Sequence, residues 1–356
     1  MSSIIPVMKP RLPGIDKLTP IFRSIEQSGI YSNYGPVLES LKTHYAEYLA
    51  VDREKIVPLA NATLAIQGAL EILGQKNWIL PDYTFAATAH AAIAAKRDIL
   101  IADVRLDNFQ LKIPESIKPS EYGALPVMPF GAEINFKDWL DFESLVIDAA
   151  ASLGSPPPNF NEMPSNSMVV YSLHATKVLG AGEGALVICE NVALARKLRA
   201  WSNFGFESSR ISTTAGINAK LSEVSSAIAL ASIMDVANEE REWLTRLQQI
   251  SNLQIPQRFK SIVDRYPGFR PYWIINVNNL DERNSLSAFL LENGVETRSW
   301  WSARLSDMPA FVNLIKLEET SNSLQLVNTH LGLPIWRNIS EESLNEIGKL
   351  LNDFLI

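Results

Sequence analysis

Short apolar runs recur along the first two thirds of the chain, and amphipathic stretches lie between many of them. The runs that predict strands are residues 56–60, 78–80, 99–104, 124–130, 145–147, 168–173 and 185–188. The stretches that predict helices are residues 63–73, 88–95 and 192–201. Strands that alternate with helices and are apolar on both faces are typical of an α/β domain with a mostly parallel sheet.

The pattern changes in the last third of the chain. A long helical pattern covers residues 221–249, after which residues 272–277 and 295–301 predict strands. Residues 285–292 and 341–355 predict further helices. We therefore expect a large α/β domain over residues 1–235 and a smaller C-terminal α+β domain over residues 236–356.

Composition narrows the class of protein. The formal net charge of −7 argues against nucleic acid or an anionic membrane as a partner. Cys189 is the only cysteine, so no internal disulfide can form, and a reducing compartment fits. The sequence starts without the pattern of a signal peptide, and no apolar run approaches the ~18 residues that span a bilayer. We expect a cytoplasmic protein that does not bind membranes.

One lysine lies at a position where a ligand-binding or catalytic residue is expected. The segment Ser172-Leu-His-Ala-Thr-Lys177 overlaps the end of a predicted strand, and a glycine-rich turn leads from it into the next strand. Ligands gather at the carboxyl ends of strands in parallel sheets. A desolvated lysine there gives up its proton more readily and can act as a nucleophile. The alternative is a solvated surface lysine.

Asp148 ends another apolar run, residues 144–148. A carboxylate in such a place is either a paired structural acid or a group directed at a ligand cation. A reactive lysine nearby favours the role directed at a ligand cation. The pyridine nitrogen of pyridoxal 5′-phosphate (PLP), a cofactor that bonds to such a lysine, needs an acidic partner to stay protonated.

Two further segments follow predicted strands. Ala62 and Thr63 open a helix, where backbone N–H groups and a hydroxyl can hold a phosphate, although Asn61 or Thr63 could simply cap that helix. Phe85 could stack on a planar ring or belong to the core. The four histidines show no metal-ligand spacing, so no metal site is expected.

Together these motifs resemble the DegT/DnrJ/EryC1/StrS aminotransferases, which are PLP-dependent nucleotide-sugar enzymes with the fold of aspartate aminotransferase (fold type I). The motifs are Tyr-Thr-Phe-Ala-Ala-Thr, Val-Ile-Asp-Ala-Ala and Ser-Leu-His-Ala-Thr-Lys followed by Gly-Glu-Gly, and the resemblance covers essentially the whole chain. It implies that Lys177 forms the Schiff base with the cofactor and that Asp148 is the partner of the pyridine nitrogen.

The resemblance also implies the other cofactor contacts. Thr63, the Ala62 backbone and Ser172 resemble the phosphate ligands, and Phe85 resembles the aromatic residue that stacks on the ring. Asn218 resembles a residue that reaches the phosphate from the neighbouring subunit, which implies a homodimer with active sites at its interface. Ala151 departs from the family, which usually has Gln or His near the ring hydroxyl, so that polar contact must come from elsewhere or from water.

The implied reaction is a transamination in which the cofactor alternates between PLP and its pyridoxamine form (PMP). We expect L-glutamate as donor and a dTDP-4-keto-6-deoxyhexose as acceptor, giving a dTDP-4-amino-4,6-dideoxyhexose, in the gluco form, for surface polysaccharide such as the O-antigen of lipopolysaccharide. Amination at C3 of a 3-keto sugar and a non-catalytic binding or regulatory protein are the alternatives. Candidate substrate contacts, each of which could equally be ordinary packing, are Tyr31, Tyr34, His174, Asn203, Phe204, Arg298 and Trp301.

Overall fold

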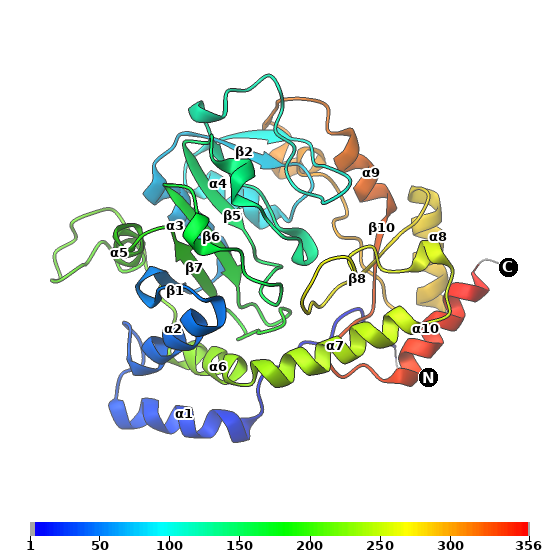
Figure 1. The fold of residues 1–356 in the computed structure, drawn as a ribbon, viewed down its shortest axis with the longest axis horizontal. Helices are drawn as coiled ribbons and strands as arrows, with labels where there is room; N and C mark the ends of the chain where they lie inside the picture. Colours follow the sequence, from blue (N-terminus) through cyan, green and yellow to red (C-terminus); the bar gives the residue numbers. More distant parts are fainter. Residues whose placement is uncertain (1–3, 355–356) are drawn as a thin grey trace.

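A central eight-stranded sheet organises the computed structural model, which describes residues 4–354 (Figure 1). Its strands, in spatial order, are β1 (Ile56–Leu59), β7 (Ala185–Cys189), β6 (Ser167–Ser172), β5 (Ser144–Asp148), β4 (Gly123–Ala124), β2 (Asn77–Pro81), β3 (Asp98–Ala102) and β9 (Ile315–Lys316). Every neighbouring pair is parallel except the two that involve β7. The prediction of an α/β fold with a mostly parallel sheet is confirmed.

Helices cover both faces of this sheet. Alternate residues of a strand point to opposite faces, and accordingly Ile147 packs in the apolar cluster with Leu38 of α2, while Val146 packs in the one with Ile66 of α3. The first face carries α1 (Ile15–Ser28), α2 (Pro36–Leu49) and α6 (Glu223–Met234), and the second carries α3 (Ala62–Leu73), α4 (Ala86–Ala94) and α5 (Val192–Trp201).

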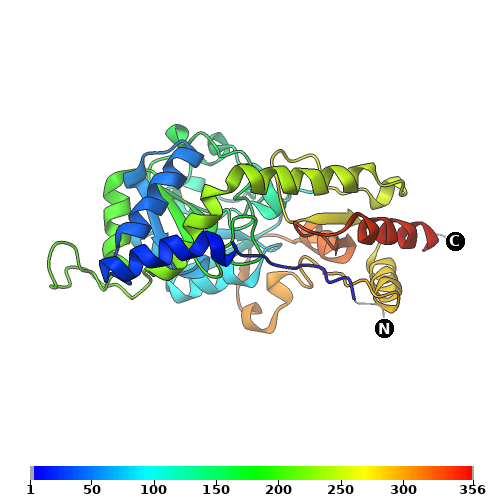
Figure 2. The same ribbon diagram turned by 90° about the horizontal axis from the view of Figure 1, so that it is seen from below.

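The C-terminal part forms a second, smaller layer. Its two-stranded antiparallel sheet pairs β8 (Trp273–Asn276) with β10 (His330–Leu333). The helices of this part are α7 (Val236–Asn252), α8 (Leu280–Glu292), α9 (Ser321–Thr329) and α10 (Glu341–Asp353). Figure 2 shows α7, α8 and α10 extending at one end of the molecule, where the segment before α1 runs alongside them. β9 returns from this part of the sequence to the edge of the large sheet.

Three predicted elements differ in the structure. The strand expected over residues 124–130 is limited to β4, because Pro126 and Pro129 have no N–H to donate to a neighbouring strand. The strand expected over residues 295–301 does not form; Val295 and Arg298 make only isolated bridges. The single helix expected over residues 221–249 is two consecutive helices, α6 and α7, separated at Asp235 (Figure 1).

The structure of residues 4–354 bears on two features that the sequence does not predict, a membrane-spanning helix and a metal site. No helix among them is both long enough and apolar enough to cross a bilayer. The same residues contain no group of three or more histidine, cysteine or acidic side chains arranged to bind a metal ion. Cys189 is fully buried in β7, and burial raises the pKa of its thiol.

Candidate active site

A cavity of about 730 Å³ lies at the carboxyl ends of β5 and β6. Residues from the part of the chain that forms most of the large sheet and residues from the C-terminal part both line it. It brings together these residues from the sequence prediction: Ala62, Thr63, Phe85, Asp148, Ala151, Ser172, His174, Lys177, Arg298 and Trp301. The volume falls in the range typical of small-molecule sites.

Lys177 lies on the loop that connects β6 to β7. Its N–H donates to the carbonyl oxygen of His174 over 2.9 Å, and the Gly180 N–H donates to the carbonyl oxygen of Lys177 over 3.1 Å. A Cβ atom at Gly180 would approach the His174 carbonyl oxygen to 2.8 Å, so this tight turn favours glycine. The turn presents the half-buried lysine side chain to the cavity, where Nζ donates to Tyr272 Oη over 3.1 Å.

Asp148 is the last residue of β5 and is buried. Thr88 Oγ1 donates to one carboxylate oxygen over 2.8 Å, and the Ala150 N–H donates to the other over 3.1 Å. Burial raises the pKa of this carboxyl group, while these two hydrogen bonds and the charge of Lys177 oppose the rise. A buried carboxylate of this kind is suited to a cationic partner, because an opposite charge favours its ionised form.

The N-terminus of α3 faces the same cavity. Asn61 caps the helix, since its side chain accepts the Leu64 N–H over 2.9 Å. The capping alternative therefore holds for Asn61, while Ala62 and Thr63, the first residues of α3, line the cavity together with Ser172 at the end of β6. A helix N-terminus with two nearby hydroxyl groups is a favourable site for a phosphate.

Aromatic side chains form one side of the cavity. We call Phe130, Tyr272, Trp300 and Trp301 the aromatic wall; all four line the cavity. Phe130 stacks on Trp301 with ring centres 5.7 Å apart and an interplanar angle of 21°. Phe85, at the start of α4, also lines the cavity and leaves 61% of its surface exposed.

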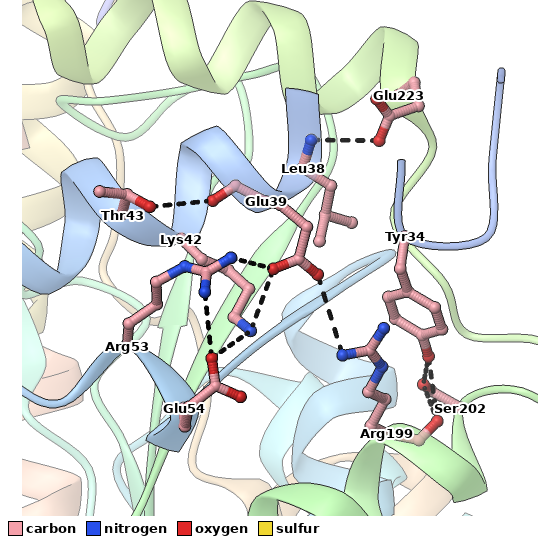
Figure 3. A network of polar contacts seen from close by, with 10 residues as sticks. All are labelled: Tyr34, Leu38, Glu39, Lys42, Thr43, Arg53, Glu54, Arg199, Ser202 and Glu223. Carbon is pink, nitrogen blue, oxygen red and sulfur yellow. Dashed lines mark hydrogen bonds and ion pairs between the residues drawn. The ribbon is translucent and has the colours of Figure 1, made fainter. Parts of the chain in front are cut away.

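Five predicted residues do not line the cavity: Tyr31, Tyr34, Asn203, Phe204 and Asn218. The side chain of Tyr34 is directed toward Arg199 and Ser202 (Figure 3). Its hydroxyl lies 2.8 Å from Ser202 Oγ, and the Arg199 guanidinium lies 4.0 Å from the ring centre. In the same network Glu223 accepts the Val37 and Leu38 N–H groups at the start of α2.

Asn203, Phe204 and Asn218 lie at the two ends of the segment that connects α5 to α6. Asn203 and Asn218 form an isolated antiparallel bridge, and Phe204 lies under the Lys220 ammonium, which is 4.8 Å from the ring centre. The loop between them projects from the body of the molecule beside α5 (Figures 1 and 2). Tyr31 is 58% exposed.

Tyr272, Trp300 and Met8 line the cavity but were not predicted as site residues. Each belongs to a segment without a local motif: Tyr272 precedes β8, Trp300 lies in an irregular segment, and Met8 precedes α1. Their position depends on how the C-terminal part and the N-terminal segment pack against the large sheet, which short-range patterns do not encode.

Comparisons with known proteins identify the family of the chain. The model of the DegT/DnrJ/EryC1/StrS aminotransferase family matches residues 16–352. A dTDP-4-amino-4,6-dideoxy-D-glucose transaminase of Shigella dysenteriae is 24% identical, with 98% of this chain and 98% of the relative covered.

Two solved structures show the same fold. DesI, determined in the presence of its TDP-sugar product, superposes with a TM-score of 0.84 at 23% identity, covering 99% of this chain and 93% of DesI. A DegT DnrJ EryC1 StrS aminotransferase from Brucella abortus superposes with a TM-score of 0.83 at 22% identity, covering 96% of this chain and 95% of that one.

The cavity fits PLP at three points. Lys177 can bond its aldehyde, Asp148 can face its ring nitrogen, and the α3 N-terminus with Thr63 and Ser172 can hold its phosphate. The chain belongs to the DegT/DnrJ/EryC1/StrS aminotransferase family and is a sugar aminotransferase with PLP as its cofactor.

Proposed function

We propose that the chain transfers the amino group of L-glutamate to C4 of a dTDP-4-keto-6-deoxyhexose. The product would be a dTDP-4-amino-4,6-dideoxyhexose in the gluco form, used for surface polysaccharide such as O-antigen. The observation that carries the proposal is that Lys177 and Asp148 meet in one cavity of about 730 Å³. The Shigella relative, which is matched over almost its whole length, supports the choice of acceptor.

The proposed chemistry assigns a task to each residue. PLP, when bound, delocalises the electron pair left on the substrate carbon. Lys177 would bond the cofactor and, once released from it, would remove the proton from the α-carbon of the amino donor and, in the second half of the reaction, deliver a proton to the sugar carbon that receives the amino group. Asp148 balances the charge of a protonated ring nitrogen from its buried position. Thr63 and Ser172 hold the phosphate beside the α3 N-terminus.

Arg298 is the candidate for binding the anionic groups of the substrates. It is the arginine that lines the cavity in the described part of the chain, and no carboxylate within residues 4–354 forms an ion pair with it. Its guanidinium lies 4.9 Å from the Trp300 ring centre, an arrangement that orients the planar group. A planar guanidinium suits carboxylates and phosphates because it can donate two parallel hydrogen bonds.

We also propose a homodimer in which Asn218 reaches the cofactor phosphate of the second copy. Asn218 lies outside the cavity of its own chain, next to the projecting loop, and Phe85 remains 61% exposed at the cavity. Mixing Lys177→Ala and Asn218→Ala proteins after dissociation and reassociation tests this. Hybrid dimers would then contain one intact site, so up to about a quarter of wild-type activity should return in a random mixture. No recovery in verified hybrids would contradict the shared site.

The acceptor is tested directly with two keto sugars. Purified protein with PLP and L-glutamate is incubated with dTDP-4-keto- or dTDP-3-keto-6-deoxyhexose, and NMR locates the new nitrogen. We expect nitrogen at C4 and formation of 2-oxoglutarate in equal amount. Lys177→Ala is the matched control and should give no product.

Other outcomes of this experiment identify the alternatives. Nitrogen at C3 would refute the assigned position and support amination of the 3-keto sugar. Binding of the nucleotide sugars without turnover by any amino donor would support the binding or regulatory role.

A further inference from the structure

A hydrogen bond joins Lys177 to a tyrosine that no sequence motif marks. Lys177 Nζ donates to Tyr272 Oη over 3.1 Å and lies 5.8 Å from the centre of the same ring. Lys177 follows β6 of the large sheet, whereas Tyr272 immediately precedes β8 of the small sheet. The reactive end of the lysine is therefore held by a residue from the other layer of the molecule.

The Tyr272 hydroxyl has a fixed position. The side chain is only 4% exposed. Phe130 and Trp300 pack against it edge-on, with ring centres 5.5 Å and 5.7 Å away. Because a tyrosine has only two side-chain torsions and these contacts restrict both, little entropy remains to be lost when the hydroxyl makes a hydrogen bond.

Lys177, in contrast, depends on an external contact for its orientation. Hydrogen bonds fix its backbone, but four flexible carbons separate Nζ from that backbone. Within residues 4–354, the bond to Tyr272 is the one side-chain hydrogen bond that Nζ makes.

Other polar groups near the lysine have partners of their own. The Thr176 hydroxyl lies 2.9 Å from the His174 ring nitrogen, and Ser172 Oγ accepts the His174 N–H over 3.2 Å. Ala150 and Ala151 line the same cavity without a polar side-chain atom. Tyr272 is thus the group placed to orient Nζ.

We propose that Tyr272 is a positioning residue that holds Nζ of Lys177 where the neutral amine condenses with the aldehyde carbon of PLP. The condensation forms one C=N bond and releases one water, with both amine hydrogens leaving in that water. The inference rests on the proposed function through the cofactor alone, and requires neither the amino donor nor the sugar to be identified.

The test compares two forms of the cofactor. PMP carries an amine in place of the aldehyde and cannot condense with Lys177, whereas PLP can. Tyr272→Phe keeps the packed ring and removes only the hydroxyl. We expect its Kd for PLP to rise about tenfold, the effect of losing one hydrogen bond to a chargeable group. Its Kd for PMP should stay within about twofold of wild type, as measured by calorimetric titration.

Two further variants serve as controls. Tyr266→Phe removes a hydroxyl from the same aromatic cluster without touching Lys177, and should change neither affinity. In a Lys177→Ala background, Tyr272→Phe should have no effect on PLP affinity, because the two residues act through one bond.

Equal weakening of PLP and PMP by Tyr272→Phe would overturn the proposal, since it would indicate damage to the pocket as a whole. Unchanged PLP affinity would overturn it as well. A protein that passes this test yet aminates neither keto sugar would contradict the proposed function and leave the role of Tyr272 intact.

Discussion

The proposed reaction centre, which consists of Lys177, Asp148 and Ser172, and the aromatic wall of the same cavity are built in different ways. Lys177, Asp148 and Ser172 each lie at or just beyond the end of a buried parallel strand, so the sheet itself brings them together. Tyr272 and Trp301 come from irregular segments of the C-terminal part. The first region is set by strand order, and the second by how two layers pack.

The two regions also differ in charge. The reaction centre keeps a carboxylate in a buried place, where burial raises the pKa of Asp148. The wall is apolar and aromatic, and its rings contact one another at 5.5–5.7 Å. We therefore expect changes in the centre to affect the reaction, and changes in the wall, apart from Tyr272 with its hydrogen bond to Lys177, to affect stability or substrate affinity.

The largest effect is expected from Lys177→Ala. The variant should lose at least about 10³-fold in activity, because proton transfer by a positioned side chain contributes that much alone. Wild-type protein with PLP should be yellow, and L-glutamate should bleach the colour. The variant should lack this response, which absorbance spectra measure. Lys197→Ala, on the exposed face of α5, is the control. A variant with the wild-type spectrum would contradict the assignment of Lys177.

Asp148→Asn should lower the activity without lowering the stability of the apoprotein. Removing one partner of a buried ion pair, here the pair of Asp148 with the protonated ring nitrogen of PLP, costs roughly 3–5 kcal/mol, so activity should fall at least about 10²-fold. The apoprotein should be at least as stable as wild type near pH 8, because a raised pKa means that the fold disfavours the ionised carboxylate. Kinetics and thermal melts of the apoprotein measure the two effects.

The stability effect of Asp148→Asn has a defined pH dependence. The unfavourable contribution of the ionised carboxylate exists above its raised pKa and disappears as the pH falls through that pKa. The variant's advantage in Tm should therefore shrink toward acid pH. Asp141→Asn, at an exposed site just before β5, should show no such trend. A variant less stable than wild type near pH 8 would contradict this reasoning.

The sequence predicts elements well where the signal is local. Residues 192–201 form α5 as expected, and α3 begins one residue before its predicted start. The prediction over residues 295–301 is wrong because Trp300 and Trp301 are apolar for another reason: they pack in the aromatic wall and do not pair with a strand. Apolar content alone does not distinguish a buried strand from an irregular segment whose side chains line a cavity.

Site residues, too, could be predicted where the signal is local and could not be predicted where packing places them. Asp148 and Lys177 could be located because Asp148 ends a strand and Lys177 lies on the loop that follows one, and strand ends share one edge of a sheet. Tyr34 is a candidate substrate contact in the sequence, but its side chain packs on Arg199 outside the cavity. The contact between Lys177 and Tyr272 joins residues 95 positions apart, and its geometry follows from the packing of two sheets. A motif identifies a segment and leaves the direction of its side chains open.

The buried contact between His330 and Tyr83, whose ring packs edge-on against Trp301 of the aromatic wall, gives a prediction about stability. Its Nδ1 lies 2.8 Å from Tyr83 Oη, and burial lowers the pKa of the imidazole to about 3. The unfolded chain binds this proton near pH 6.5. As the pH falls from 6.5 toward 3, the unfolded chain binds a proton at His330 that the folded protein does not. The free energy of unfolding of wild type should therefore decrease by up to about 1.4 kcal/mol per pH unit.

The difference in the free energy of unfolding between wild type and a His330 variant separates the contribution of His330 from those of other titrating groups. In His330→Gln, denaturant melts from pH 7 to 4 should show a shallower loss of stability. His90→Gln, at an exposed site, should follow wild type. Parallel curves for wild type and His330→Gln would contradict the predicted effect of burial.

Trp301→Phe is expected to give the smallest effect and bears most directly on the comparison. The indole lines the cavity, stacks on Phe130 and meets Tyr83 edge-on at 4.8 Å. A smaller ring keeps part of this packing, so the KM for the nucleotide sugar should rise about three- to tenfold, as for the loss of one aromatic contact. The kcat and the KM for L-glutamate should stay near wild type. Loss in the glutamate half-reaction would instead mean that Trp301, like Tyr272, supports the chemistry, and the two regions would no longer have separate tasks.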